Sequence, residues 1–296
     1  MFRKKEVAAV TTHADSGVKN LANALKKVTS VRNQPLIMVR NISKSYRNKL
    51  VLKDVTFEVF SGDIFGLVGM SGSGKTTLFQ IMAGMITVQA GDVLVRQDIF
   101  DLKKKEDMPD YISVFRNHSL IKRQFGFASQ LPSFYEHLTV EENLQMYGSL
   151  YGLKSSRIKE NMTRLLKLVD LSDERDTIAG ELSGGMQRRL DIACSLIHDP
   201  KVLFLDEPTS DLDPLMRKQI WKLIKDIQSK GTTIVLASHI LEEVENLCTK
   251  VAIIHGKRML GYGTLNELKS SLGKGRKSKA TLTDIFEALA GNGTVG

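Results

Sequence analysis

The chain has 296 residues, and 42% of them are hydrophobic, which is enough to build the core of one large α/β domain with appendages or of two domains. No apolar run approaches the roughly 18 residues of a membrane-spanning helix, and the first residues lead into no signal-peptide core, so we expect a soluble, cytoplasmic protein. The two cysteines, Cys194 and Cys248, each lie within a helical pattern, which favours reduced, partly buried thiols over a disulfide or a metal site.

The net charge of +9 is concentrated at the two ends of the chain. Residues 1–35 hold seven Lys or Arg against two acids, and residues 273–296 hold four against two. Basic ends can contact nucleic acid or an anionic membrane surface, but solvated tails are commoner. We therefore expect a weakly ordered basic arm over 1–35, with a short amphipathic helix around 18–28 as the alternative.

The ordered domain is predicted to begin with a sheet at residue 36. Strand-like runs cover 36–42, 51–60 and 64–68, with turn residues between them. Tyr46 lies in the first connection, where its planar ring can either stack on an adenine or simply pack, and the sequence leaves both interpretations open.

The third strand runs directly into the segment Gly69-Met70-Ser71-Gly72-Ser73-Gly74-Lys75-Thr76-Thr77, and a helical pattern follows. This order suits a phosphate, because glycines let the backbone close around the anion while N–H groups of the turn and of the helix N-terminus point at it. Lys75 is then expected to reach the β- and γ-phosphates, and Thr76 to ligate Mg²⁺. The alternative is an ordinary glycine turn.

Residues 91–95 predict a further strand, after which the polar stretch 98–121 shows no clean period. We interpret that stretch as a surface excursion. Residues 125–130 then indicate another short strand, which ends in Gln130.

An all-helical insert is predicted next, at about 131–185. A Thr-x-x-Glu capping box opens a helix at about 139–151, and a second helix is predicted at about 156–169. The exposed face of this insert is a natural place for a partner.

Two further segments carry candidate chemistry. Residues 182–187, Leu-Ser-Gly-Gly-Met-Gln, lead into a helix through His198, so that a capping serine, two glycines and a helix N-terminus form either a second anion site or only a turn and a cap. The apolar run 202–205 predicts a strand buried on both faces, and it ends in Asp206 and Glu207. Asp206 suits the shell of a Mg²⁺ ion, and Glu207 suits a base that polarises the attacking water.

The last third of the chain is predicted to complete the sheet. Asp213-Pro214 is a helix N-cap followed by proline at the first helical position. His239 follows a buried strand at 232–237, at the sheet edge where ligands collect, so a phosphate contact is favoured over a packed or solvated histidine.

The C-terminal part starts with strands at 251–254 and 258–261. Residues 269–280 indicate a flexible basic linker. Within 281–296, apolar residues at helical spacing predict a short helix that docks back on the domain, followed by a tail.

Taken together and in this order, these segments closely resemble the ATP-binding subunit of an ABC transporter over about residues 36–268. One such motif is weak evidence, but the full ordered set is highly specific. The resemblance implies an α/β fold with a P-loop NTPase (RecA-like) core, an N-terminal antiparallel β subdomain and the inserted α-helical subdomain. It also implies ATP and Mg²⁺ as cofactors, and ATP hydrolysis coupled to transport across a membrane.

The resemblance also implies a role for each motif. Residues 69–77 look like the Walker A loop, and Asp206 and Glu207 look like the end of Walker B with its catalytic glutamate. Tyr46 looks like the aromatic residue that stacks on adenine. Gln130 is similar to the glutamine that senses Mg²⁺ and the attacking water, and His239 to the switch histidine at the γ-phosphate. The implied catalytic set is Glu207, His239, Gln130 and Lys75, and the implied metal set is Thr76, Gln130 and Asp206.

Other motifs imply partners. Ser183, Gly184 and Gly185 lie in a segment that resembles the signature motif, which in this family closes the nucleotide held by a second subunit. Asp213 resembles the loop that crosses the dimer interface. We therefore expect a homodimer, or a pair with a paralogous ATPase subunit, around two ATP molecules. We also expect a separate transmembrane permease subunit that holds the chain at the cytoplasmic face of the membrane and docks around 130–151.

The C-terminal patterns 238–245, 261–265 and 282–286 look like the multidrug and antibiotic exporter type, which favours export. Two rival functions are each compatible with part of the sequence. A soluble ABC-type ATPase acting on nucleic acid would use the basic ends, but the chain has no long coiled coil and no cysteine-based zinc module, so we expect no stable nucleic-acid complex. A small-molecule kinase would leave residues 182–187 and His239 unexplained.

Overall fold

The structure, a computed structural model, describes residues 34–100, 110–271 and 280–291. Most of the predicted arm at 1–35 and of the predicted linker at 269–280 lies outside the described residues, as does the tail at 292–296.

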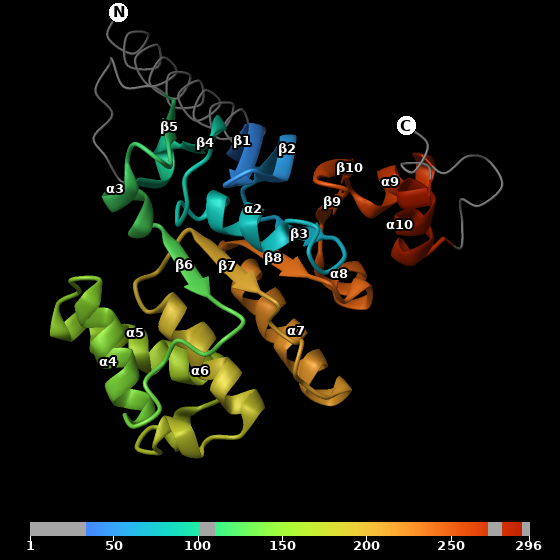
Figure 1. Cartoon of the computed structure of the whole chain (residues 1–296). Helices are drawn as coiled ribbons and strands as arrows, with labels where there is room; N and C mark the ends of the chain where they lie inside the picture. Colours follow the sequence, from blue (N-terminus) through green and yellow to red (C-terminus); the bar gives the residue numbers. More distant parts are fainter. Residues whose placement is uncertain (1–33, 101–109, 272–279, 292–296) are drawn as a thin grey trace, which may run out of the picture.

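The described residues at the N-terminal end form a four-stranded antiparallel sheet in the order β2-β1-β4-β5 (Figure 1). Its strands are β1 (Pro35–Tyr46), β2 (Lys49–Phe60), β4 (Ala90–Arg96) and β5 (Tyr111–Ser113). Val39 lies opposite Phe57 on one side and Val93 on the other, and all three side chains are buried. One face of this sheet therefore packs on the core, as the alternation of apolar residues predicted.

The prediction of a surface excursion over 98–121 is wrong for the part that the structure describes. A 3-10 helix, η1 (Gln97–Phe100), the strand β5 and the helix α3 (His118–Lys122) occupy it. Phe100, Val114 and Ile121 are buried. Apolar residues set singly in elements of three to five residues produce no detectable period, so the burial comes from tertiary contacts rather than from local pattern.

A second sheet forms the centre of the molecule, in the order β10-β9-β3-β8-β7-β6 among the described residues. Its strands are β3 (Ile64–Val68), β6 (Phe125–Ala128), β7 (Val202–Asp206), β8 (Thr233–Ser238), β9 (Lys250–His255) and β10 (Arg258–Gly263). All pairs are parallel except the pair of β9 and β10. Every residue of β3, β7 and β8 is buried, because helices or the first sheet cover both faces of these strands.

Helices flank this sheet (Figure 1). Four of them are α2 (Lys75–Met82), α6 (Gly184–Leu196), α7 (Pro214–Ser229) and α8 (Leu241–Leu247). The helices α4 (Val140–Leu150) and α5 (Ser155–Leu168) gather with α6 on one side, away from β1 and β2, and short 3-10 turns η2 (Ser172–Glu174) and η3 (Ala179–Glu181) precede α6. At the other end lie α9 (Leu265–Ser271) and α10 (Leu282–Gly291).

The local signals for these helices are confirmed. Thr139 and Glu142 form both halves of the capping box of α4, and the Asp213 side chain accepts bonds from two N–H groups at the start of α7. The terminal helix docks as predicted, because Leu282 and Ile285 on α10 are fully buried. Cys194 and Cys248 are both buried free thiols, and burial raises the pKa of each well above its ordinary value.

Candidate functional site

Four of the predicted site segments follow directly on parallel strands of the central sheet. The strands β3, β6, β7 and β8 run in the same direction, with Val68 in register with Ser238 and Asp206 with Ala237. Their carboxyl ends therefore meet at one edge of the sheet, which is where ligands bind in open α/β folds. Gly69, Glu207 and His239 directly follow β3, β7 and β8, and Gln130 follows β6 after one intervening residue, Ser129.

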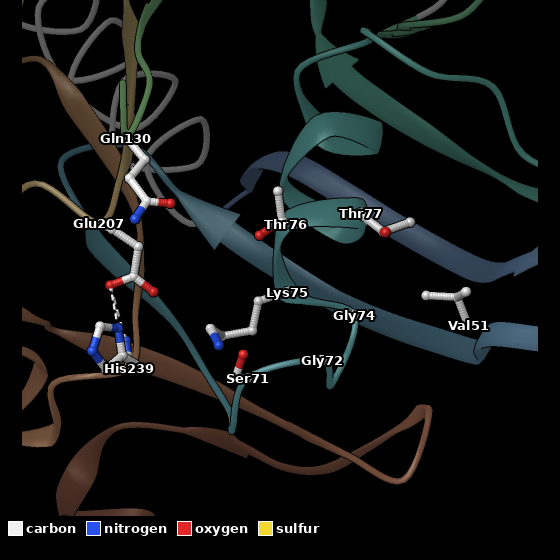
Figure 2. Close-up of a pocket in the computed structure, with 10 residues that line it drawn as sticks. All are labelled: Val51, Ser71, Gly72, Gly74, Lys75, Thr76, Thr77, Gln130, Glu207 and His239. Carbon is white, nitrogen blue, oxygen red and sulfur yellow. Dashed lines mark hydrogen bonds and ion pairs between the residues drawn. The ribbon is translucent and has the colours of Figure 1, made fainter. Parts of the chain in front are cut away.

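These segments enclose a cavity of about 400 Å³ (Figure 2). It is lined by Val51, Ser71, Gly72, Gly74, Lys75, Thr76, Thr77, Gln130, Glu207 and His239. In Figure 2, Gln130, Glu207 and His239 lie on one side and the glycine loop with the start of α2 on the other. A compact molecule bound here is contacted from both sides.

The glycine loop has a backbone that other residues would not allow. A Cβ atom on Gly69 would lie 2.4 Å from the carbonyl oxygen of Ile254, so no side chain fits there. Gly72 and Gly74 have φ values of +75° and +100°, in the left-handed region that favours glycine. Gly74 is also the N-cap of α2, so the loop leads straight into a helix N-terminus. A glycine-rich loop that leads into a helix N-terminus is an arrangement that binds phosphate.

Ser73 is the residue of this loop whose side chain lies against Gly69. Its hydroxyl oxygen is buried and has no hydrogen-bond partner among the described residues. Buried polar atoms are almost always paired in native proteins, so this unpaired hydroxyl is an exception, and it lies outside the cavity lining.

Lys75 is the first residue of α2, and its side chain reaches back to the glycine loop. Its ammonium group donates to the carbonyl oxygens of Gly69, at 2.6 Å, and of Met70, at 3.2 Å. Burial lowers the pKa of Lys75, while the carboxylates of Glu207 and Asp206 act in the opposite direction. The loop therefore holds a partly desolvated positive charge, which strengthens its attraction for an anion.

The two carboxylates at the end of β7 lie in different surroundings. Asp206 is the last residue of the strand and is buried; this burial, and then the neighbouring Glu207 carboxylate, raise the pKa of Asp206. Glu207 has a φ of 48°, and its N–H donates to the carbonyl oxygen of Ala237 at 2.8 Å. A glutamate in the left-handed region is uncommon, and here that conformation turns the side chain towards the cavity.

Glu207 and His239 form a pair across the strand ends (Figure 2). Nδ1 of His239 donates to Oε2 of Glu207 at 2.7 Å, and the N–H of His239 donates to the same oxygen at 3.3 Å. The glutamate side chain is only 12% exposed, whereas that of the histidine is 55% exposed. The pair fixes one carboxylate oxygen of Glu207.

Not all predicted site residues meet in this cavity. The predicted site residues that are not among its lining residues are Tyr46, Gly69, Met70, Ser73, Ser183, Gly184, Gly185 and Asp206. The ring of Tyr46 faces the ammonium group of Lys44, 5.1 Å from the ring centroid. Ser183 caps α6 by accepting from the N–H of Met186 at 3.3 Å.

Two residues were missed at the sequence level. Val51 lines the cavity beside Gly74, and it carried no signal because an apolar residue in a strand is ordinary. Arg188 contacts the backbone on both sides of Glu207, and it carried no signal because its partners are carbonyl groups far away in sequence.

A phosphate-binding loop, an oriented carboxylate and a second carboxylate at the ends of adjacent parallel strands define a P-loop ATPase. The sequence model of a family described as ABC transporter matches residues 52–210. This chain is 34% identical over 232 residues to "Nod factor export ATP-binding protein I" of Rhizobium sp. (strain N33). The aligned region covers 78% of this chain and 72% of that protein. It is 32% identical over 254 residues to "Linearmycin resistance ATP-binding protein LnrL" of Bacillus subtilis (strain 168). This alignment covers 86% of this chain and 77% of that protein.

A solved structure described as an ATP-binding subunit of an ABC transporter superposes with a TM-score of 0.73 at 27% identity, over 86% of this chain and 99% of that one. The chain belongs to the ABC transporter family, as an ATP-binding subunit whose ATP hydrolysis drives transport. Among the described residues, no helix has both the length and the apolar character that crossing a bilayer requires. ATP-binding subunits of this family work together with transmembrane subunits.

Proposed function

We propose that this chain is the motor of an exporter and that two copies, or one copy and a paralogous subunit, bind two ATP molecules between them. The observation that carries the catalytic part of the proposal is the Glu207–His239 pair, which faces the Lys75 loop across the cavity. A carboxylate held in one orientation opposite a phosphate-binding loop suits the attack of water on a terminal phosphate.

In this proposal, the N–H groups of residues 69–77 and the ammonium group of Lys75 bind the phosphates. Glu207 accepts a proton from the attacking water as the oxygen bonds to the γ-phosphorus, and the bond from that phosphorus to the bridging oxygen breaks, leaving its electron pair on ADP. His239 holds Glu207 in place, and Lys75 stabilises the charge on the transferred phosphoryl group. Tyr46 stacks on the adenine.

The residues at the site also suit Mg²⁺. Thr76, Gln130 and Asp206 offer a hydroxyl, an amide oxygen and a carboxylate, which are the hard oxygen ligands that Mg²⁺ takes beside nucleotide phosphates. When bound, Mg²⁺ neutralises charge on the β- and γ-phosphates. A nearby cation would also oppose the burial that raises the pKa of Asp206 and would keep this carboxylate charged.

The partner subunit is proposed to close the site. Gly184 begins α6, and a Cβ atom there would meet nothing within 4 Å, so this helix N-terminus is accessible to a large ligand. Ser183, Gly184 and Gly185 of one copy would contact the γ-phosphate held by the other, which makes ATP part of the dimer interface.

The transport role rests on the relatives and on the surface around Gln130. The two relatives are named for Nod factor export and for linearmycin resistance, which supports export here. We propose that residues 36–268 form the ATPase domain and that a separate permease holds it at the cytoplasmic face of the membrane. The segment 130–151 is proposed to receive the permease, because Leu131 is 77% exposed and Tyr135 is 56% exposed there.

Substituting Glu207→Gln tests this proposal, since glutamine keeps the size of the side chain but cannot accept the proton. We expect ATP turnover to fall by about a hundredfold or more. We also expect an ATP-bound dimer to accumulate in size-exclusion chromatography. The control is Glu242→Gln, because Glu242 is exposed at the start of α8 and does not line the cavity. Unchanged turnover in the Glu207 variant, or a variant that stays monomeric with saturating ATP and Mg²⁺, would contradict the mechanism.

A further inference from the structure

Arg188 is a buried cation that the proposed chemistry does not use. It lies on α6, and its side chain is only 9% exposed. Burial lowers the pKa of Arg188, and the carboxylates around it act against this effect, with Asp191 first among them. A buried guanidinium is costly unless its donors are all satisfied, so its contacts are informative.

The guanidinium donates to three backbone carbonyl groups at the edge of the cavity. Nη1 donates to the carbonyl oxygen of Ser129 at 2.5 Å, Nη2 to that of Asp206 at 3.0 Å, and Nε to that of Pro208 at 3.0 Å. Ser129 directly precedes Gln130, and Asp206 and Pro208 are the two neighbours of Glu207. One side chain therefore fixes the backbone next to both cavity residues.

Asp191, one turn further along α6, extends this contact. It accepts from Nη1 of Arg188 at 3.2 Å, and its other oxygen accepts from the N–H of Ser133 at 3.0 Å and from the Ser133 hydroxyl at 2.6 Å. The segment that contains Gln130 is thus held on both sides, at Ser129 and at Ser133. Arg188 and Asp191 connect α6 to the two segments that carry Gln130 and Glu207.

The start of the same helix carries Ser183. Arg188 is five residues from Ser183, or about 7.5 Å along a helix axis. A hydrogen-bonded α-helix moves as a rigid unit over this distance. A displacement of the Ser183 end would therefore be transmitted directly to the carbonyl groups beside Gln130 and Glu207.

We propose that Arg188 is a positioning residue that couples the two ATP sites of the dimer. The coupling rests on the proposed function, in which Ser183 of this copy contacts the γ-phosphate held by the other copy. ATP in the partner's site fixes the N-terminus of α6, and Arg188 then sets Gln130 and Glu207 of its own site in the arrangement for hydrolysis. The planar fork of an arginine suits this task, because it can bind several carbonyl groups in fixed directions, whereas a lysine ammonium is a compact charge on a flexible stem.

The neighbouring residue provides a matched control. Arg189 lies on the same helix and is 17% exposed, but it donates to Asp170 at 3.2 Å and to Gln219 at 2.6 Å. Neither of these partners lines the ATP cavity. Arg189 is therefore an arginine of α6 that makes hydrogen bonds as Arg188 does but does not contact the backbone beside Gln130 or Glu207. Substituting it controls for the loss of an arginine from this helix.

The experiment measures ATP hydrolysis against ATP concentration for the full chain and for Arg188→Met, Arg188→Lys and Arg189→Met. Because Arg188 does not line the nucleotide cavity, we expect Arg188→Met to lower kcat by about tenfold or more while KM changes by less than about threefold. We also expect it to abolish positive cooperativity in ATP, which the wild type should show. Arg188→Lys keeps the buried charge and serves as a control for misfolding. Its kcat should lie between that of the wild type and that of Arg188→Met. Arg189→Met should keep kcat within about twofold and retain cooperativity.

Three results would overturn the coupling. The first is that both Arg188 variants keep the kcat and the cooperativity of the wild type. The second is that kcat falls equally in Arg188→Met and Arg189→Met. The third is that the wild type shows no cooperativity in ATP. Glu207→Gln is assayed in parallel to separate this proposal from the one on which it rests. If Glu207→Gln stops turnover while the Arg188 variants behave as wild type, only the coupling is wrong. If Glu207→Gln keeps full turnover, the proposed mechanism is wrong and the coupling is rejected with it.

Discussion

His198 makes the stability of this protein depend on pH in a calculable way. Its ring stacks on Tyr151 with centroids 3.5 Å apart and an interplanar angle of 5°, and its Nε2 lies 3.1 Å from the carbonyl oxygen of Phe125. The other nitrogen, Nδ1, is buried and has no hydrogen-bond partner in the part of the chain that the structure describes. Protonation would place a second N–H there without an acceptor. Burial accordingly lowers the pKa of His198 from 6.5 to about 4, although the Phe125 carbonyl and Asp199 act in the opposite direction.

The sign and the size of the effect follow from linkage. The unfolded chain binds the proton more readily than the folded one, so stability is complete above pH 6.5 and falls as the pH decreases towards 4. One pKa unit corresponds to about 1.36 kcal/mol, which gives a loss of about 2 kcal/mol between pH 7 and pH 5 from this residue alone.

The assay is urea unfolding of the nucleotide-free chain at several pH values, followed by the fluorescence of Trp221, the single tryptophan, which is buried on α7. His198→Gln keeps an N–H donor for the Phe125 carbonyl but cannot be protonated in this range. We expect the wild type to lose about 2 kcal/mol more than this variant between pH 7 and pH 5. His137→Gln, at an exposed position, should lose as much as the wild type. Equal losses in the wild type and His198→Gln would refute the reasoning.

Further predictions concern the loop, the metal and a helix cap. Gly69→Ala places a Cβ atom 2.4 Å from the Ile254 carbonyl oxygen, so we expect ATP binding to be lost, as measured by isothermal titration. Because its pKa is raised, Asp206 should be protonated more readily than an ordinary aspartate as the pH falls. The Mg²⁺ concentration needed for half-maximal activity should therefore rise as the pH falls, and removal of Mg²⁺ with EDTA should abolish turnover. Asp213→Ala removes the acceptor of two N–H groups of α7 and should lower the free energy of unfolding by about 1 kcal/mol in urea.

The sequence predicted the parts of this protein that are encoded locally. A buried apolar run that ends in a glycine loop or in carboxylates predicts a strand with a ligand-binding residue after it, and the structure brings Gly69, Gln130, Glu207 and His239 to one edge of one sheet. The helix caps at Thr139 and Asp213 were equally local.

What the sequence could not predict depends on contacts between distant segments. The strand β5 has three residues, which is too short for alternation to be detected, and β5 forms because β4 offers it an edge. The left-handed conformation of Glu207 is set by its bond to Ala237, thirty residues away. Arg188 has a role only because three carbonyl groups from two other segments converge on it.

The contacts of Lys75 change how a substitution there should be interpreted. Its ammonium group donates to two carbonyl oxygens of its own loop, so phosphate oxygens that bind Lys75 must compete with these two acceptors. Lys75→Ala would therefore leave the Gly69 and Met70 carbonyl oxygens without this donor and loosen the loop before any nucleotide arrives. Such a variant would lose ATP affinity for two reasons, the missing positive charge and a less rigid loop. Only the loss of rigidity would appear as faster amide exchange when no nucleotide is present.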